Sequence, residues 1–388
     1  MERLVTSNFK LGIIAGGQLG KMLIQEASKW DITTYVLDND ENCPAGGIAS
    51  HYIKGSNIDF DSVYQFGKMV DVLTFEIENV NIESLKKLKS EGHRIVPDPE
   101  ILELIQDKGL QKEFYGKHGI PTANFKIYDT IPAILKGVEE GEINFPFVQK
   151  LRKGGYDGRG VAVVNNKSDL PKLLSGTSVI EKKVEIAKEI SVIAARNKKG
   201  EIKCYPVVEM LFDPSANLVD KLICPSSITA EQSEKAVNLA SEIITLLKME
   251  GLLAVEFFVD SKGEVIVNEM APRPHNSGHH TIESIITSQF EQHLRAILNL
   301  PLGSTELKLP SVMINILGNE GHEGPVIYEG LTESMAIDGV KIHLYGKKIT
   351  KPYRKMGHVT VLSSSLECAL NNAEKVKQLI RVKSWKKS

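Results

Sequence analysis

The sequence has few of the features that mark exported, membrane-bound or nucleic-acid-binding proteins. No apolar run approaches the roughly 18 residues of a membrane-spanning helix, and residues 1–10 lack the apolar core of a signal peptide. Basic and acidic residues nearly balance, 47 against 49, so charge gives no reason to expect a nucleic acid or a membrane surface as partner. These absences favour a cytoplasmic protein that acts on small molecules.

Cysteine is also scarce. The four cysteines are scattered without a paired motif, which argues against disulfides and against structural zinc. By contrast, 42% of the 388 residues are hydrophobic, which is enough for about two to four domains with cores of their own. We expect the cysteines to be ordinary packing residues: Cys43, Cys204, Cys224 and Cys368.

The first hundred residues resemble a doubly wound domain in their pattern. Residues 11–14 predict a strand, a glycine turn follows, and apolar residues then recur at helical spacing. A second strand over 33–37 ends at Asp38, where dinucleotide-binding folds place the acid that binds ribose. The loop between them reads AGGQLG, so Ala15 replaces the first glycine of the G-x-G-x-x-G fingerprint. We therefore favour a doubly wound domain without NAD over a dinucleotide site.

Two places in this domain are candidate ligand contacts. The predicted helix start at Gly20 is suited to an anionic ligand, because the first amides of a helix point outward. A third strand, over 70–75, is followed by Glu76 and Asn79, where the crevice residues of such sheets lie. We interpret these two side chains as candidate substrate contacts.

A basic loop rich in glycine follows a strand predicted over 146–150. Residues 152–160, called the glycine loop below, read RKGGYDGRG, with four glycines in nine residues. Glycine lets the backbone approach phosphates closely, but no Gly-Lys-Ser/Thr opens a helix here, so this is not a Walker loop. The pattern leaves two interpretations open, a flap over phosphates and a plain hairpin turn.

The rest of the chain is read mainly from its periodicity and its prolines. Apolar stripes predict helices over 100–118, 230–250 and 281–300. Residues 206–220 break twice at proline and are predicted to be a loop. Short strands are predicted over 179–184, 189–195, 312–317, 340–344 and 359–362.

The most informative stretch is a hairpin predicted over 252–270. If its loop is Lys262 and Gly263, Glu256 lies directly opposite Glu269 on one face. Cross-strand partners have β-carbons about 5 Å apart, so their carboxylates repel unless a proton or a cation lies between them. Mg²⁺ that is bound to a nucleotide suits such a pair. A solvated face is the alternative, and a loop one residue longer would put the glutamates on opposite faces. The polar segment 272–279 that follows is unlike an ordinary connection.

The motifs, taken in order, resemble the ATP-grasp superfamily over most of the chain. More narrowly, the chain is similar to the 5-(carboxyamino)imidazole ribonucleotide synthase (PurK) family. The motifs that carry this resemblance are GGQLG from Gly16, GGYDGRG from Gly154, KEISVI from Lys188, NEMAPRPHNSGH from Asn268 and RKMGH from Arg354. The resemblance implies that ATP phosphorylates bicarbonate and that the resulting carboxyphosphate delivers carbon dioxide to the amine of 5-aminoimidazole ribonucleotide. ADP and phosphate leave.

The resemblance also implies a fold and an assembly. We expect an α/β ATP-grasp fold with an amino-terminal doubly wound (Rossmann-like) domain and a small β-rich carboxy-terminal domain. The expected parts are an amino-terminal domain over 1–100, the small ATP-grasp subdomain over 101–185, the large one over 186–305 and the carboxy-terminal domain over 306–388. A homodimer is expected from the resemblance alone.

The resemblance assigns site residues one by one. Glu256 and Glu269 match the magnesium ligands, for about two Mg²⁺ ions that accompany ATP. ATP contacts are implied for Lys108, Lys150, Gly155, Tyr156, Asp157, Gly158, Arg159, Gly160, Val161, Glu181, Lys182, Lys183, Val184, Glu189, Asn268 and Glu269. Catalytic roles fall to Lys150, Tyr156, Asp157 and Arg159. Substrate contacts are expected from Gln18, Glu76, Asn79, His275, Asn276, Ser277, Lys347, Arg354 and Lys355.

This sequence departs from the family pattern in places. Lys108 stands where arginine is usual, so a point charge replaces a fork, and Phe212 stands where many relatives have a histidine near the nucleotide. The basic segment 347–355 is read as a site for the substrate's 5′-phosphate, with a solvated surface as the alternative. Two other functions are weighed: another ATP-grasp ligase, such as formate-dependent glycinamide ribonucleotide transformylase, and a nucleotide-binding module without turnover.

Overall fold

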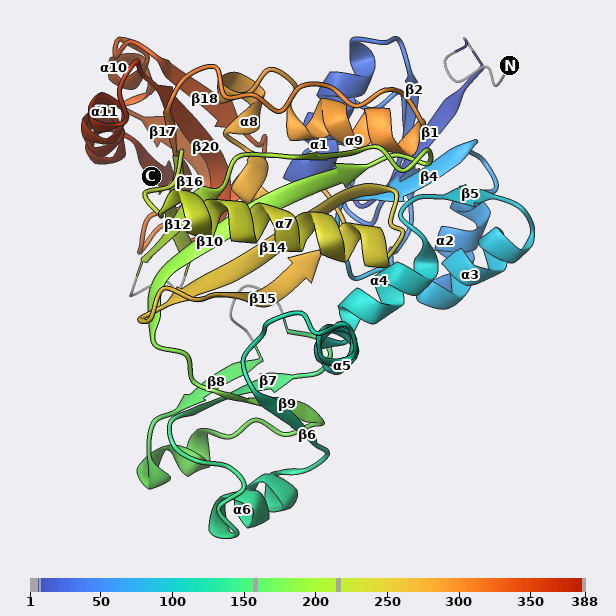
Figure 1. Ribbon diagram of the computed structural model, residues 1–388. Helices are drawn as coiled ribbons and strands as arrows, with labels where there is room; N and C mark the ends of the chain where they lie inside the picture. The colour runs from blue at the N-terminus through green and yellow to red at the C-terminus, as the bar shows by residue number, and fades with distance from the viewer. Residues whose placement is uncertain (1–5, 7, 156–159, 214–217, 386–388) are drawn as a thin grey trace.

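The computed structural model describes residue 6 and residues 8–155, 160–213 and 218–385. Figure 1 shows a small lobe of strands and helices lying apart from a larger body, with helix α5 beside the place where they meet. The larger body combines the amino-terminal sheet, one long mixed sheet and the carboxy-terminal elements. In the described part of the chain, no helix has the length and apolar character needed to cross a membrane.

The amino-terminal sheet has five parallel strands in the order β3-β2-β1-β4-β5. Its strands are β1 (Lys10–Ile14), β2 (Thr33–Asp38), β3 (His51–Lys54), β4 (Val72–Phe75) and β5 (Arg94–Ile95). Its helices are α1 (Gln18–Ser28), α2 (Phe60–Gly67) and α3 (Ile82–Ser90). The strands predicted over 11–14, 33–37 and 70–75 are confirmed as β1, β2 and β4, and the apolar runs of β1 and β4 are buried on both faces.

The helix predicted over 100–118 is two helices, so that prediction is wrong in its middle. Helix α4 spans Pro99–Gln106 and α5 spans Lys108–His118. Asp107 separates them, because its backbone is extended and its side chain accepts hydrogen bonds from the first amides of α5. The end of α5 at Gly119, in the left-handed conformation, agrees with the predicted stop.

The small lobe is an antiparallel sheet in the order β6-β9-β7-β8. Its elements are β6 (Phe125–Tyr128), α6 (Ile131–Glu139), β7 (Phe147–Leu151), β8 (Val161–Val164), the 3-10 helix η1 (Lys167–Lys172) and β9 (Ser178–Lys182). Strands β7 and β8 pair directly on either side of the glycine loop. The loop is therefore the connection of a hairpin whose base is fixed by the sheet.

The large sheet has nine strands in the order β15-β14-β10-β12-β13-β16-β20-β18, with β11 added beside β10. Its strands are β10 (Ile186–Arg196), β11 (Ile202–Cys204), β12 (Val208–Asp213), β13 (Leu218–Cys224), β14 (Gly251–Asp260), β15 (Val265–Ala271), β16 (Ser311–Leu317), β18 (Val340–Leu344) and β20 (Lys355–Leu362). The loop predicted over 206–220 is wrong. Pro206 precedes β12, so it removes no donor from the paired segment, and Pro214 lies outside the described residues.

One helix covers the large sheet and another joins it to the amino-terminal domain. Helix α7 (Ala230–Leu246) begins with the predicted capping box of Thr229 and Gln232 and packs on β10 and β14. The helix predicted over 281–300 is instead α8 (Thr281–Ser284) and α9 (Gln289–Ile297), preceded by the 3-10 helix η2 (Asn276–Gly278). It breaks because Ile285 is extended and bridges to Leu307. The apolar stripe of α9 is core, as predicted, and packs against α1.

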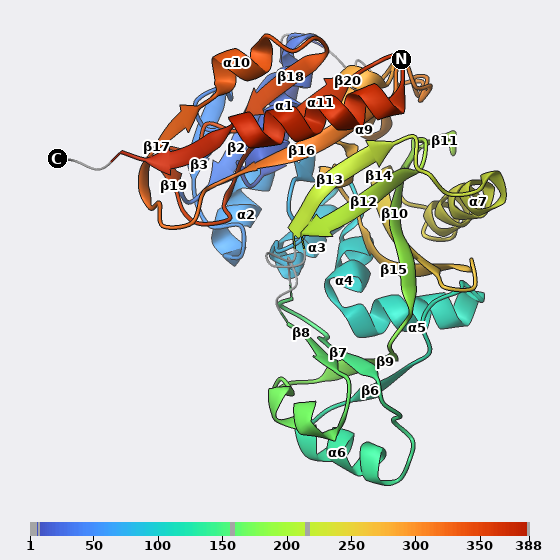
Figure 2. The same ribbon diagram turned by 90° about the vertical axis from the view of Figure 1, so that its left-hand side faces the viewer.

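The carboxy-terminal strands β16, β20 and β18 continue the large sheet, and a small sheet in the order β19-β17-β21 lies beside them. The remaining elements are β17 (Gly324–Glu329), α10 (Leu331–Met335), β19 (Ile349–Thr350), α11 (Leu366–Leu379) and β21 (Arg381–Ser384). Figure 2 shows α11 lying across this end of the large sheet. The strands predicted over 312–317, 340–344 and 359–362 are confirmed.

Candidate functional site

Two glutamates face each other across the β14–β15 hairpin. Glu256 is the register partner of Glu269, which confirms the prediction that they lie opposite each other. The predicted two-residue loop is wrong, because Asp260 N donates to Glu264 O at 2.9 Å and leaves three residues in the turn. The register shifts between Glu256 and Phe257. That β-bulge adds one residue to β15 and cancels the extra residue of the turn.

The bulge also explains why two consecutive side chains of β15 meet lysines. The Lys150 ammonium on β7 donates to Asn268 Oδ1 at 2.8 Å, and Lys108 on α5 donates to the neighbouring Glu269 carboxylate. In a regular strand, neighbours point to opposite faces, whereas a bulge re-aims one of them. Helix, small lobe and large sheet therefore each contribute a polar group to one cluster.

Glu181 connects this cluster to the interior of the lobe. Its carboxylate lies 3.1 Å from Lys150 and 3.1 Å from Lys112, and the Lys112 and Glu181 side chains are both almost fully buried. Lys112 also donates to Thr122 Oγ1 at 2.6 Å. Burial lowers the pKa of Lys112 to about 8, although Glu181 opposes the shift. Sequence reasoning missed Lys112, whose helical position gives no sign of a distant carboxylate.

The opposed glutamates carry different charge. Lys108 lowers the pKa of Glu269, whereas burial and the charges of Glu269 and Glu189 raise the pKa of Glu256. Burial likewise raises the pKa of Glu189 to about 7. The pair is thus neutralised partly by a lysine and partly by a proton, which is the behaviour expected of a cation site between two carboxylates.

The residues present fit Mg²⁺ that arrives with a nucleotide. Glu256 and Glu269 offer opposed carboxylates, and Asn268, the neighbour of Glu269 on β15, accepts a hydrogen bond from Lys150. Throughout the described ranges, no three His, Cys, Asp or Glu side chains are grouped to hold a metal by themselves. Mg²⁺ commonly binds through one or two carboxylates and completes its shell with water and phosphate oxygens.

The glycine loop is described only at its two ends. Gly154 and Gly160 have positive φ angles of 77° and 79°, and Leu151 N donates to Gly160 O at 2.8 Å, which closes the hairpin. Val161 follows as the first residue of β8, opposite Lys150. The remaining predicted loop contacts are Tyr156, Asp157, Gly158 and Arg159, which lie outside the described residues.

The segment after β9 joins the two lobes and offers mainly its backbone. Lys182 and Lys183 are exposed, and Lys183 Nζ donates to Asn165 Oδ1 at 2.9 Å, within the small lobe. Val184 is half-buried, and β10 begins soon after it. Glu189 comes from β10, whose neighbour β14 carries Glu256. Among the described residues, the predicted ATP contacts Lys150, Glu181, Asn268 and Glu269 therefore meet where β7 and β9 of the small lobe approach β15 of the large sheet.

A second group of predicted residues lies beside the glutamate pair. His275 Nε2 is 3.6 Å from Glu256 Oε1, and its Nδ1 shares a 2.8 Å hydrogen bond with Ser277 Oγ. Burial and the charge of Arg273 lower the pKa of His275 to about 3, so this imidazole is neutral. Asn276 Oδ1 is buried and, among the described residues, has no hydrogen-bond partner. A buried polar atom without a partner in the protein indicates a site for a polar ligand or an ordered water.

Glu76 lies at the start of α1. Its carboxylate accepts from Gly17 N at 2.8 Å and Gly20 N at 2.7 Å, next to Gln18. The Glu76 carboxylate therefore occupies the start of α1, the position that the sequence had suggested for an anionic ligand. Asp38, considered as a ribose ligand, accepts from Gly16 N at 2.7 Å.

Arg273 was not among the predicted site residues, although it stands in the polar segment 272–279. It lies 2.7 Å from Glu78, and its Nε is buried without a hydrogen-bond partner in the described structure. Asn79, one residue beyond Glu78, accepts from Asn57 Nδ2 through its backbone. The ion pair of Arg273 and Glu78 thus links the segments that follow β4 and β15, near Glu76 and His275.

The basic segment of the carboxy-terminal domain reaches the amino-terminal domain. Lys348 Nζ donates to Asn42 Oδ1 at 2.6 Å. Lys347 Nζ donates to Lys355 O at 2.8 Å, and Arg354 Nη1 donates to Ile349 O at 2.6 Å. The charge of Lys355 contributes to lowering the pKa of His275, which places this lysine near the polar segment 272–279.

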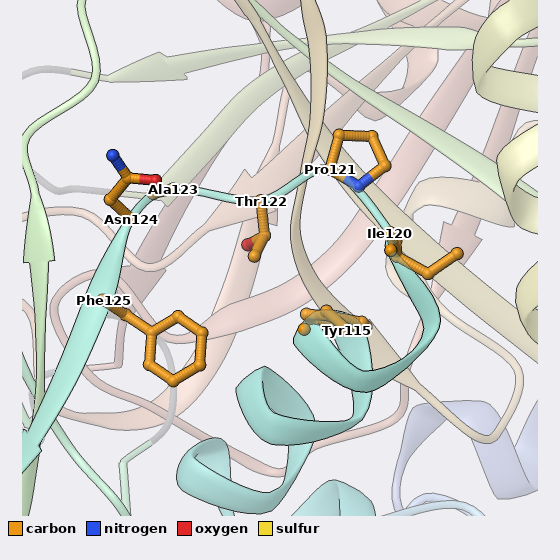
Figure 3. A pocket seen from close by; sticks show the side chains of 9 residues that line it. Tyr115, Ile120, Pro121, Thr122, Ala123, Asn124 and Phe125 are labelled. Carbon is orange, nitrogen blue, oxygen red and sulfur yellow. The ribbon is translucent and has the colours of Figure 1, made fainter.

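A cavity of about 460 Å³ lies where α5 turns into β6. Figure 3 shows Tyr115 and Ile120 on the helix side and Asn124 and Phe125 on the strand side. Its lining meets the lysine cluster at Lys112, which donates to Thr122 Oγ1 and lies 5.9 Å from the centre of the Tyr115 ring. None of the predicted site residues that the structure describes lines this cavity.

Comparisons with known proteins agree with this arrangement. Three family models match: the ribonucleotide synthetase preATP-grasp domain over 9–106, the ATP-grasp domain over 113–290 and the phosphoribosylaminoimidazole carboxylase C-terminal domain over 311–372. The N5-carboxyaminoimidazole ribonucleotide synthase of Bacillus subtilis is 36% identical, with 93% of each chain covered. The chloroplastic phosphoribosylaminoimidazole carboxylase of Vigna aconitifolia is 38% identical over 93% of this chain, which spans 65% of that relative's length.

Solved structures give the same result. The N5-carboxyaminoimidazole ribonucleotide synthetase of Thermotoga maritima superposes with a TM-score of 0.90 at 46% identity, covering 97% of this chain and 100% of that chain. The N5-carboxyaminoimidazole synthase of Aspergillus clavatus, solved with ADP and 5-aminoimidazole ribonucleotide, has a TM-score of 0.87 at 33% identity. That likeness covers 96% of this chain and 99% of that chain.

Proposed function

The chain belongs to the N5-carboxyaminoimidazole ribonucleotide synthase family of ATP-grasp ligases, and we propose that it carries out the reaction for which the family is named. Bicarbonate oxygen attacks the γ-phosphorus of ATP and ADP leaves. Carboxyphosphate then transfers its carboxyl group, as carbon dioxide, to the amine of 5-aminoimidazole ribonucleotide, and inorganic phosphate leaves. The products are ADP, phosphate and the N-carboxylated ribonucleotide.

The observation that carries this proposal is the meeting of Glu256, Glu269, Lys108 and Lys150 between the lobes. Phosphoryl transfer needs positioned positive charge around the phosphates more than it needs covalent help. When bound, Mg²⁺ supplies part of that charge, and Glu256 and Glu269 are the side chains that would hold it. Lys108 and Lys150 would bind the phosphates, each as a point charge.

The backbone of residues 181–184 would hold the adenine, since Lys182 and Lys183 turn their side chains to solvent. Carboxyphosphate reacts with water, so the glycine loop would also exclude solvent. Within it, Tyr156, Asp157 and Arg159 keep the proposed roles near the transferred group. Arg159 would stabilise developing negative charge there.

The polar residues beside the glutamate pair would bind the ribonucleotide. The Aspergillus clavatus relative was solved with ADP and 5-aminoimidazole ribonucleotide. In this chain we propose that the base and ribose contact Gln18, Glu76, Asn79, His275, Asn276 and Ser277. Lys347, Arg354 and Lys355 would bind the 5′-phosphate. A homodimer, a place in the cytoplasm and the expected domain boundaries remain predictions.

The test is the dependence of ATP consumption on both co-substrates. The protein is incubated with ATP, Mg²⁺, bicarbonate and 5-aminoimidazole ribonucleotide, and ADP is followed over time. We expect ADP release to need the ribonucleotide and bicarbonate together. ADP release that ignores the ribonucleotide, or that responds to formate instead of bicarbonate, would reject the proposal in favour of another ATP-grasp ligase. Binding of ATP without any turnover would indicate a nucleotide-binding module.

A further inference from the structure

A two-pronged ion pair joins the strand that carries Lys150 to the helix that carries Lys108. Arg152, just after β7, donates from Nε to Asp107 Oδ1 at 2.7 Å and from Nη2 to Asp107 Oδ2 at 2.9 Å. The backbones meet at the same place, because Lys108 N donates to Arg152 O at 2.9 Å. A fork of this kind fixes orientation as well as distance, which a lysine in place of the arginine would not do.

Asp107 has a second role in the same place. Its Oδ1 also accepts from Gly109 N at 2.8 Å and Leu110 N at 3.2 Å, so it caps helix α5. Lys108 is the first residue of that helix. The carboxylate that receives the arginine fork therefore also fixes the point from which the Lys108 side chain leaves the helix.

Glycine at position 109 makes room for the arginine. A Cβ atom added to Gly109 would lie 2.6 Å from Arg152 Nε, closer than a real Cβ contact permits. Any larger residue would push the guanidinium away from the first turn of α5. The contact is therefore built into the sequence at three positions, 107, 109 and 152.

The ion pair does not serve a hydrophobic core. Asp107 and Arg152 line an open cavity of about 530 Å³ together with polar neighbours such as Asp129, Lys153 and Thr177. About a quarter of the Arg152 side chain, 26%, is exposed. Removing the ion pair would leave no apolar void, so the removal should mainly change the relative placement of α5 and β7.

We propose that Arg152 and Asp107 form a latch that sets the separation of the Lys108 and Lys150 ammonium groups. The proposal rests on the proposed function, in which these lysines hold the phosphates of ATP. Lys108 follows Asp107 directly, and Lys150 lies two residues before Arg152. With the latch intact, the two cations are held in place before the nucleotide arrives. Arg152 and Asp107 are then positioning residues, not catalytic ones.

Three variants separate this role from a general effect on folding or charge. Arg152→Lys keeps the charge and loses the fork. Asp107→Asn keeps the helix cap and weakens the ion pair. Gly109→Ala displaces the guanidinium although alanine favours the helix. Lys126→Ala is the matched control, because it removes an exposed 2.9 Å ion pair with Glu142 from the same lobe.

We expect each of the three variants to lower kcat/KM for ATP by about ten- to a hundredfold, because small displacements of positioned groups cost this much. The KM for 5-aminoimidazole ribonucleotide should stay within about twofold, and Lys126→Ala should match the wild type. Arg152→Lys or Gly109→Ala with wild-type ATP kinetics would overturn the latch.

A binding measurement keeps the two proposals apart. Calorimetry with MgATP and no ribonucleotide should show weaker nucleotide binding in all three variants. Equal binding in the variants and the wild type would reject the latch even if the enzyme turns over. A wild type that binds MgATP but shows no ribonucleotide-dependent turnover would reject the proposed function, while weaker binding in the variants would still support the latch.

Discussion

The Lys108 ammonium on helix α5 lies against the Glu269 carboxylate on strand β15. A side-chain cation thus already balances one of the two opposed glutamates, while burial raises the pKa of its partner Glu256. Binding of ATP with its metal would replace that balance and leave Lys108 available to the phosphates. In the proposed function, Mg²⁺ would take over from Lys108 the task of balancing the Glu269 charge.

Glu269→Gln is expected to abolish turnover and leave the fold intact, because it removes a metal-binding charge at almost constant size. The measurement is ADP release at saturating Mg²⁺, with circular dichroism to check folding. Glu264→Gln is the control, since Glu264 is on the same hairpin but 62% exposed and paired with Lys235. Near-wild-type activity of Glu269→Gln would show that the metal assignment is wrong.

Lys112→Met is expected to destabilise the protein by about 3 kcal/mol, because it leaves the buried Glu181 with one of its two lysines. Urea unfolding followed by tryptophan fluorescence measures the change. Lys126→Met breaks an exposed ion pair instead and should leave the free energy of unfolding almost unchanged. Equal, small effects of the two substitutions would mean that the Lys112–Glu181 pair adds no stability.

Arg354→Ala is expected to raise the KM for 5-aminoimidazole ribonucleotide by roughly ten- to a hundredfold, since it removes charged hydrogen bonds to a phosphate. The KM for ATP should not change. Lys351→Ala serves as control, because Lys351 is exposed and pairs with Glu323. If neither constant changes in Arg354→Ala, the basic segment is a solvated surface. A rise in the ATP constant alone would mean that the two phosphate sites have been interchanged.

Acid should weaken the packing of the carboxy-terminal domain through a stack of buried histidines. His279 stacks on His358 with ring centroids 4.6 Å apart, and His358 stacks on His343 at 4.5 Å. Burial is the largest cause that lowers the pKa of both His279 and His358, and the charge of Lys355 lowers the pKa of His279 further. A lowered pKa means that the unfolded chain binds these protons first. Stability is therefore present above the ordinary histidine pKa and is lost as pH falls below about 6.5.

His279→Phe tests this pH dependence. Neither ring nitrogen of His279 has a hydrogen-bond partner in the described structure, so phenylalanine keeps the stacking and removes the titration. The apparent free energy of unfolding between pH 7 and pH 5 should fall less steeply, by up to about 1.4 kcal/mol per pH unit. His51→Phe, at an exposed stacked histidine, should keep the wild-type slope. An unchanged slope in His279→Phe would contradict the account.

The sequence was informative where the pattern is local. Short apolar runs gave the strands of the amino-terminal sheet, and Thr229 with Gln232 gave the start of α7. The break at Asp107 was missed although aspartate is a common helix-capping residue. The break at Ile285 was missed because it depends on a distant partner, Leu307. Helical periodicity does not record such contacts.

The opposed glutamates show how a correct prediction can rest on an incorrect detail. The register of Glu256 and Glu269 was right, but the turn is one residue longer and a bulge at Asn268 restores the alignment. The bulge has no clear sequence signal at this hairpin, although Gly263, with a φ of 85°, suits the last position of a three-residue turn. The links from Lys108 to Glu269 and from Lys112 to Glu181 span separate elements, so composition and spacing alone did not place them.

The most direct test of the central claim follows an oxygen atom. Bicarbonate labelled with oxygen-18 is mixed with ATP, Mg²⁺, 5-aminoimidazole ribonucleotide and the protein. The reaction is stopped before the bicarbonate exchanges its label with water, and the released phosphate is analysed by mass spectrometry. Because a bicarbonate oxygen attacks the γ-phosphorus and stays on it, the account predicts one labelled oxygen in each released phosphate. Unlabelled phosphate, with ADP released at the same rate, would contradict a carboxyphosphate intermediate and the proposed reaction with it.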